Sequence, residues 1–97
     1  MATLDDIAER SQDMRDRLDW FKLDIEGAEE RALRGAMKTI AKFRPTIIVE
    51  AHVFLDADLA DKCEAVIREA SGNTYSFERV DRDPCVMLIG RPEEQCL

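Results

Sequence analysis

The pattern of apolar and polar positions predicts a helix followed by a buried strand in the first quarter of the chain. After a plausible N-cap at Thr3, apolar residues recur at helical spacing among charged ones, at Leu4, Ile7, Met14 and Leu18. The segment DWFKLDI, residues 19–25, is short and apolar on both faces apart from Lys22. This composition predicts a strand buried on both sides, as is typical of parallel sheets.

The next segment has the pattern of a crossover helix and a second strand. From Ala28 to Phe43 apolar residues repeat with the helical period, and Pro45 ends the helix because the residue before a proline disfavours helical geometry. Gly35 weakens the interior of this helix by about 1 kcal/mol relative to alanine. Residues 46–51, TIIVEA, give the strongest strand signal in the chain. The order predicts a βαβ unit with two parallel strands.

The last third predicts a second helix and a hairpin. Residues 57–70 place one apolar face on a helix, and Ser71-Gly72-Asn73 is a suitable stop. Tyr75–Val80 and Cys85–Ile89 read as strands close enough to pair as a hairpin. We therefore expect residues 1–97 to form a single α/β domain of about four strands, two parallel and then a C-terminal antiparallel hairpin, with flanking helices and a frayed tail.

Composition and charge narrow the classes of partner. Apolar residues make up 45% and charged residues 36% of the chain, which is typical of a globular domain. The formal net charge of −7 repels phosphate backbones and anionic lipids, so we expect no nucleic-acid or membrane partner. No apolar run approaches the length of a membrane span. The expected location is the cytoplasm.

The cysteines predict packing rather than a disulfide framework or a zinc site. Cys63, Cys85 and Cys96 are odd in number and widely spaced. Cys63 shares a helical face with apolar residues and is expected in the core. Cys96, next to the C-terminus, is the one expected to be reactive.

Four polar residues follow the two parallel strands and form the candidate site. Asp24 and Glu26 end the first strand, and Glu50 and His52 end the second. Ligands of open parallel sheets bind beyond the carboxyl ends of the strands. Residues two apart share a face and neighbouring strands lie about 4.8 Å apart, so these side chains can converge.

Two interpretations of these four residues stay open. Each one alone can be a polar strand end or a helix N-terminal acid with nothing bound. Grouped together, like charges are costly to bury unless a substrate, a metal or proton transfer uses them. The spacing D-x-E with E-x-H does not separate a general base from a ligand of magnesium, manganese or zinc.

A longer run of residues carries a family resemblance. FKLDIEGAEERALRGAMKTIAKFRPTIIVEAH, from Phe21 to His52, contains K-x-D-x-E-G-x-E, then L-x-G-A, then R-P-x-x-x-x-E. In this order the motifs resemble the hallmark stretch of FkbM-type methyltransferases. The segment Thr3-Leu4-Asp5-Asp6 resembles the T-L-D segment that precedes this stretch in the family.

The resemblance implies a class I methyltransferase with a Rossmann-like, seven-stranded sheet and S-adenosylmethionine as methyl donor. The reaction implied is transfer to a hydroxyl, often on a sugar or a polyketide-like product. By position the chain would supply the fourth and fifth strands and the final hairpin, the C-terminal portion of the domain. The donor's glycine-rich loop and its ribose-binding acid lie in the first three strands of the family, and these 97 residues contain no glycine-rich loop after a strand.

For such a methyl transfer, the placement of the four polar residues at the strand ends suggests a role for each. His52 or Glu26 would be the base that removes the hydroxyl proton, Asp24 would orient the methyl acceptor, and Glu50 would hold the other ring nitrogen of His52. The isolated chain is expected to be inactive, because the donor-binding half is missing. The alternative is a non-enzymatic fragment or interaction module. Without the first three strands, the strand at residues 20–25 would present an open apolar edge and favour self-association.

Overall fold

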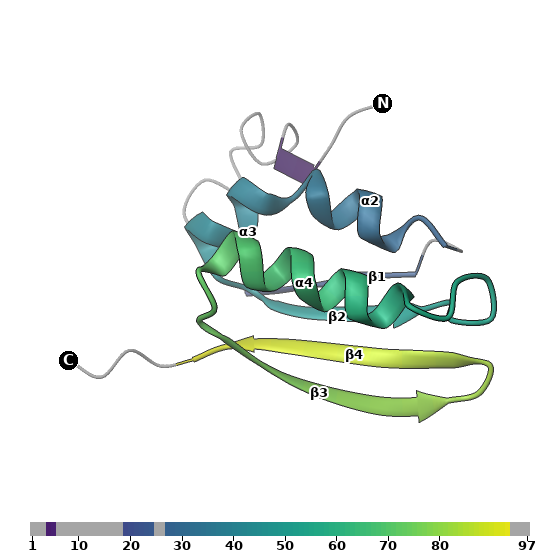
Figure 1. Ribbon diagram of the computed structural model, residues 1–97. Coiled ribbons are helices and arrows are strands. Elements are labelled where there is room, and N and C mark those ends of the chain that lie inside the picture. Colours follow the sequence, from purple (N-terminus) through teal and green to yellow (C-terminus); the bar gives the residue numbers. More distant parts are fainter. Residues whose placement is uncertain (1–3, 6–18, 25–26, 94–97) are drawn as a thin grey trace.

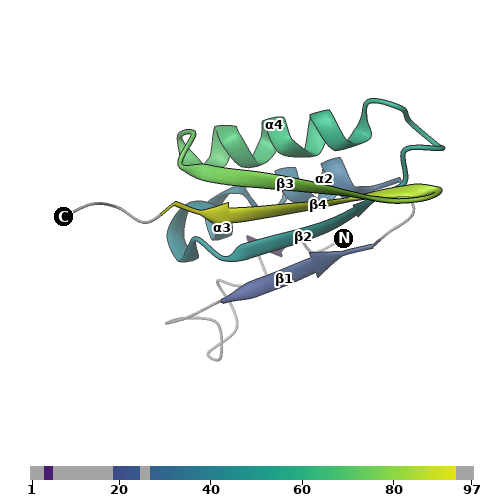
Figure 2. The same cartoon turned by 90° about the horizontal axis from the view of Figure 1, so that it is seen from below.

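The computed structural model describes residues 4–5, 19–24 and 27–93. Its elements, in chain order, are β1 (Trp20–Leu23), α2 (Glu29–Arg34), α3 (Met37–Phe43), β2 (Thr46–Ala51), α4 (Leu59–Ser71), β3 (Tyr75–Arg82) and β4 (Cys85–Pro92). These helices lie together over one face of the sheet (Figure 1). In the view from below, the strands lie in front of them (Figure 2).

The sheet has four strands in the order β1-β2-β4-β3. β1 runs parallel to β2, with Trp20 opposite Thr46 and Leu23 opposite Val49. β4 is antiparallel to both of its neighbours, β2 and β3. This arrangement confirms the predicted α/β class, with two parallel strands and a C-terminal hairpin.

The hairpin is longer than the sequence pattern predicts. β3 continues to Arg82 and β4 to Pro92, beyond the expected ends at Val80 and Ile89. The added residues are mainly polar and exposed, so they carry no apolar signal. Backbone pairing extends the strands there, with Arg82 opposite Cys85 at the turn.

The predicted helix over residues 28–43 is divided into α2 and α3. α2 ends at Gly35, whose carbonyl accepts a hydrogen bond from the backbone N–H of Asp5 at 2.9 Å. The Asp5 carboxylate in turn accepts the N–H groups of Lys38 and Thr39, at 3.2 and 2.8 Å, and the Thr39 hydroxyl at 2.7 Å. The prediction of one continuous helix was therefore wrong. Gly35 permits the break, and Asp5, distant in sequence, caps α3.

The core lies between the helices and the covered face of the sheet. Its fully buried side chains come from α2, α3, α4, β2, β3 and β4, among them Leu33, Ile40, Ile47, Val49, Cys63, Val66, Ile67, Tyr75 and Leu88. The Tyr75 hydroxyl donates a 2.6 Å hydrogen bond to the carbonyl of Pro45, which satisfies the one polar atom of this ring inside the core.

β1 corrects the expectation of a strand buried on both faces. Trp20 is 61% exposed and Lys22 is also exposed, whereas Phe21 and Leu23 pack against the core. The physical reason is that the described helices cover only one face, so alternate residues point away from them. Phe21 and Leu23 therefore lie on the face of β1 that the helices cover.

Several predictions fall outside the described residues. Of the expected N-terminal helix only Leu4 and Asp5 are described, and both are helical. The tail with Cys96 and the strand-end residues 25–26 are also outside. Over residues 4–5, 19–24 and 27–93, no helix is long and apolar enough to cross a membrane.

Candidate functional site

The carboxyl ends of β1 and β2 bring two of the predicted site residues together. Asp24 directly follows β1 and His52 directly follows β2. Because the two strands are parallel and in register, their ends meet at the same edge of the sheet. Oδ1 of Asp24 lies 3.3 Å from Nε2 of His52. Asp24 is half exposed, whereas the His52 residue is only 8% exposed.

A third residue, Glu29, completes this arrangement from the helical side. It stands in the first turn of α2 and is fully buried. Its carboxylate accepts the backbone N–H of Gly27, with the shorter distance 3.0 Å, and the backbone N–H of His52 at 3.3 Å. Its Oε1 also lies 3.2 Å from Nδ1 of His52. These contacts offset the cost of burying the charge.

The turn before α2 is shaped so that its backbone can reach this carboxylate. Gly27 has φ of 97°, in the left-handed region that residues with a Cβ rarely adopt. A Cβ added at this position would also lie 3.3 Å from Cδ1 of Leu55. The glycine of the E-G-x-E motif thus has a conformational reason to be there.

The contacts of the His52 ring favour one arrangement of its proton. Both oxygens of Glu29 receive backbone N–H groups, so this carboxylate acts as a hydrogen-bond acceptor. Nδ1–H of His52 then donates to Glu29, and Nε2 faces the carboxylate of Asp24. The edge of the ring also meets Phe54, with centroids 5.7 Å apart.

Glu50 lies on the other face of the sheet from this group. It alternates with the buried residues Val49 and Ala51, and its Oε2 is 3.9 Å from Nζ of Lys22. The contact expected between Glu50 and the second ring nitrogen of His52 is made by Glu29. Glu26, the fourth predicted residue, lies outside the described residues.

Sequence reasoning missed Glu29, although it is the last acid of K-x-D-x-E-G-x-E. The available signal was an acidic residue in the first turn of a helix, which by itself indicates a favourable interaction with the helix dipole. Nothing local showed that its partner would be the backbone and ring of a residue 23 positions later.

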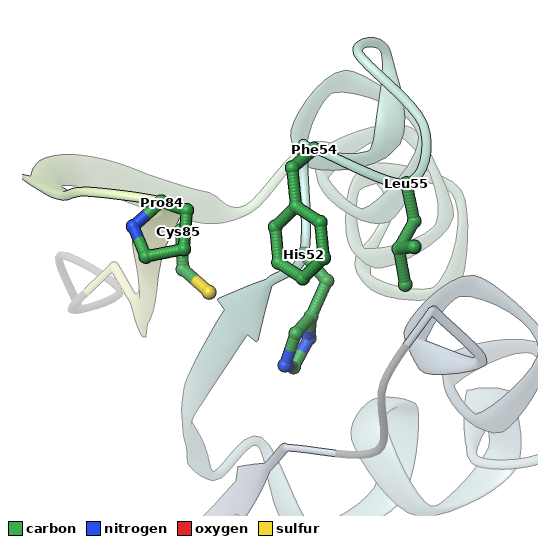
Figure 3. A pocket seen from close by; sticks show the side chains of 5 residues that line it. All are labelled: His52, Phe54, Leu55, Pro84 and Cys85. Carbon is green, nitrogen blue, oxygen red and sulfur yellow. The ribbon is translucent and has the colours of Figure 1, made fainter.

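An open pocket of about 480 Å³ lies beside His52 and is lined also by Phe54, Leu55, Pro84 and Cys85 (Figure 3). Phe54 and Leu55 come from the loop after β2, and Pro84 and Cys85 from the hairpin turn and the start of β4. Partial burial raises the pKa of the Cys85 thiol, so this side chain adds no charge to the pocket at physiological pH. The pocket therefore combines one imidazole with mainly apolar walls.

Cys63 plays no part in this pocket. It is fully buried on α4, as predicted, and burial raises the pKa of its thiol to about 12. A thiol with this pKa is almost never a thiolate at neutral pH, and it therefore serves as a packing residue.

The described residues offer no ready metal centre. Over residues 4–5, 19–24 and 27–93, no group of three or more His, Cys, Asp or Glu side chains is arranged to hold a metal ion. A centre of the kind considered from sequence would need Glu26, which lies outside these ranges.

Comparison with known proteins places the chain in a family. The sheet with its flanking helices is consistent with a partial methyltransferase fold, and a model of the methyltransferase FkbM domain matches residues 1–81. The chain belongs to the FkbM methyltransferase family. Comparisons with curated proteins and with solved structures gave no match.

The donor that the family implies, S-adenosylmethionine, does not fit the described residues. Donor sites of this fold class use a glycine-rich loop between a strand and a helix. The described part of the β1–α2 turn has one glycine, Gly27, whose N–H is bonded to Glu29. The loop between β2 and α4 has none. The described residues therefore do not form a donor site of this kind.

Proposed function

We propose that this chain forms the C-terminal, acceptor-binding portion of an S-adenosylmethionine-dependent methyltransferase that methylates a hydroxyl of a small molecule or sugar. Membership of the FkbM family supports the reaction class. The observation that carries the proposal is the placement of His52. Its Nδ1 is tied to the buried Glu29, while its ring lines an open pocket at the carboxyl end of the parallel strands.

His52 has the position of a general base. Methyl transfer forms a bond from the hydroxyl oxygen to the methyl carbon, breaks the bond from that carbon to the donor sulfur, and releases the hydroxyl proton. Nε2 of His52 accepts this proton, since Nδ1 already donates to Glu29. Asp24, 3.3 Å from Nε2, stabilises the charged ring and orients the hydroxyl. Glu26 remains the alternative base.

The methyl donor binds outside the described residues in this proposal. S-adenosylmethionine, when bound, supplies a methyl group on a positively charged sulfur. The chain's own part is to bind the methyl acceptor, hold its oxygen in line and remove its proton, and correct alignment alone contributes several kcal/mol to such reactions. In the family, the strands that carry the donor loop precede the portion that the structure describes.

The test is methyl transfer from labelled S-adenosylmethionine to a panel of hydroxylated small molecules by the native protein and its variants, expressed from the natural coding sequence. His52→Gln is expected to lower kcat by about 100-fold or more, the usual contribution of a general base. Glu78→Gln, an exposed change on β3, is the matched control and should retain full activity. Full activity of the His52 variant, or no transfer to any hydroxyl, would refute the proposal.

A further inference from the structure

We infer that the pocket beside His52 takes a methyl acceptor whose hydroxyl is carried on an apolar ring, in preference to a sugar. That the ligand is a methyl acceptor rests on the proposed function. The chemical class of the ligand is inferred from the pocket alone. The pocket is lined by His52, Phe54, Leu55, Pro84 and Cys85 (Figure 3).

The hydrogen-bonding capacity of the lining is suited to one hydroxyl. Phe54, Leu55 and Pro84 contribute no polar side-chain atom, and a neutral thiol such as that of Cys85 is a weak partner. Among the described lining residues, His52 is the one with a strong hydrogen-bonding group, and Asp24 lies 3.3 Å from its Nε2, where both can bind the same hydroxyl. A sugar would bring several hydroxyls against apolar walls, and each hydroxyl that loses water without a partner weakens binding.

Two of the walls are apolar side chains that the fold leaves exposed. Phe54 and Leu55 are each 58% exposed, and they stand next to one another after β2. Large exposed apolar side chains that gather at a pocket indicate a ligand surface more strongly than scattered ones do. A ligand ring packed against them removes this apolar area from water, which favours binding.

The loop that carries these walls is held in place before any ligand arrives. The backbone N–H of Val53 donates to the carbonyl of Ala51, and that of Leu55 to the carbonyl of His52, both at 2.9 Å. Asp56, next in the chain, forms a 2.6 Å ion pair with Lys62 on α4. A wall ordered in this way loses little entropy on binding.

The size of the pocket agrees with a small ring compound. Its volume of about 480 Å³ lies within the range of roughly 300–1,000 Å³ found for small-molecule sites. The Phe54 ring already meets the His52 ring edge to face, so an aromatic ligand can extend the same contact.

The experiment is an NMR titration of the labelled chain with 4-ethylphenol and, separately, with glucose. His52 is the one histidine of the sequence, so its ring signals are unambiguous. We expect 4-ethylphenol to shift the signals of His52 and Phe54, and glucose at the same concentration to leave them unchanged.

Variants locate the binding surface. Phe54→Ala and Leu55→Ala should each weaken 4-ethylphenol binding by about fivefold, because each removes part of the apolar contact. Val80→Ala, on β3 and 38% exposed, is the matched control and should bind as the parent does. All of these side chains are exposed, and the dispersion of the spectra reports whether the fold is retained.

Glucose shifts as large as those of 4-ethylphenol, or equal affinity in the Phe54 and Leu55 variants, would overturn the inference. The titration contains no methyl donor, so its result is independent of the reaction. If 4-ethylphenol binds as expected and the native protein transfers no methyl group, the proposed function fails while the pocket assignment stands.

Discussion

The carboxylate of Glu29 lies 3.2 Å from Nδ1 of His52 and 3.3 Å from its backbone N–H, so one buried side chain holds both the main chain and the ring of the candidate base. The contact also joins the first turn of α2 to the end of β2. Stability and the geometry of the site therefore depend on the same residue.

Glu29→Ala should lower the free energy of unfolding by about 3 kcal/mol, because it leaves buried N–H groups of Gly27 and His52 without this partner. Urea unfolding followed by circular dichroism measures the change. Glu30→Ala, in the same helical turn, loses a surface ion pair with Arg34 and should cost less than about 1 kcal/mol. Equal costs for the two variants would show that the Glu29 contacts contribute little.

Asp5→Ala should destabilise the protein by about 1 kcal/mol or more, the usual cost of losing a helix cap. Hydrogen exchange should accelerate at the amides of Lys38 and Thr39, which donate to this carboxylate. Asp58, at the N-cap of α4, makes no side-chain capping bond, so Asp58→Ala is the control and should change stability less. Unchanged exchange at both amides would contradict the role given to Asp5.

The raised pKa of the Tyr75 hydroxyl predicts that the protein loses stability at high pH. Burial raises the pKa of its hydroxyl from 10.0 to about 12. The unfolded chain ionises first, so the stabilisation is complete below pH 10 and is lost as pH rises toward 12. Tyr75→Phe should cost about 1 kcal/mol at pH 7 through the lost bond to Pro45, yet show a smaller decline above pH 10. Parallel declines in both proteins would assign the effect to other groups.

The chain of residues 1–97 should not bind S-adenosylmethionine with useful affinity, because its described residues offer no glycine-rich donor loop. Isothermal titration calorimetry of the purified chain is the direct measurement, with an active S-adenosylmethionine-dependent methyltransferase as the positive control. A one-to-one complex with a micromolar dissociation constant would require a donor site of another kind.

We further expect self-association through β1. In the described sheet β1 is an edge strand that pairs only with β2, it has no proline, and its first residue, Trp20, is 61% exposed. The net charge of −7 opposes association, so added salt should promote it. The measurements are solution mass against concentration and hydrogen exchange at residues 20–23. A strict 11.1 kDa monomer whose β1 amides exchange as fast as loop amides would refute this expectation.

The elements with strong periodicity could be predicted from the sequence, and the features that depend on remote partners could not. β2 and α4 have clear apolar patterns, and their predicted positions agree with the structure to within about two residues. The break at Gly35 depends on Asp5, 30 positions earlier in the chain. No local pattern contains that contact.

The candidate site divides in the same way. Asp24 and His52 could be brought together from sequence because parallel strands in register align their ends. Glu50 could not be placed, because its side of the sheet depends on where the described helices pack. Glu29 was missed because a buried acid and a surface acid in the first turn of a helix look alike in sequence.

The position of β4 between β2 and β3 has a consequence for how the protein is made. Ile47 of β2 pairs with Gly90, and Tyr75 of β3 pairs with Pro92. Neither β2 nor β3 can complete its pairing until the residues near the end of β4 are available. During synthesis these residues leave the ribosome after all the other described elements. Until then β2 and β3 have no strand between them, and the nascent sheet is open along its middle. Chaperone binding to the growing chain should therefore persist until β4 emerges.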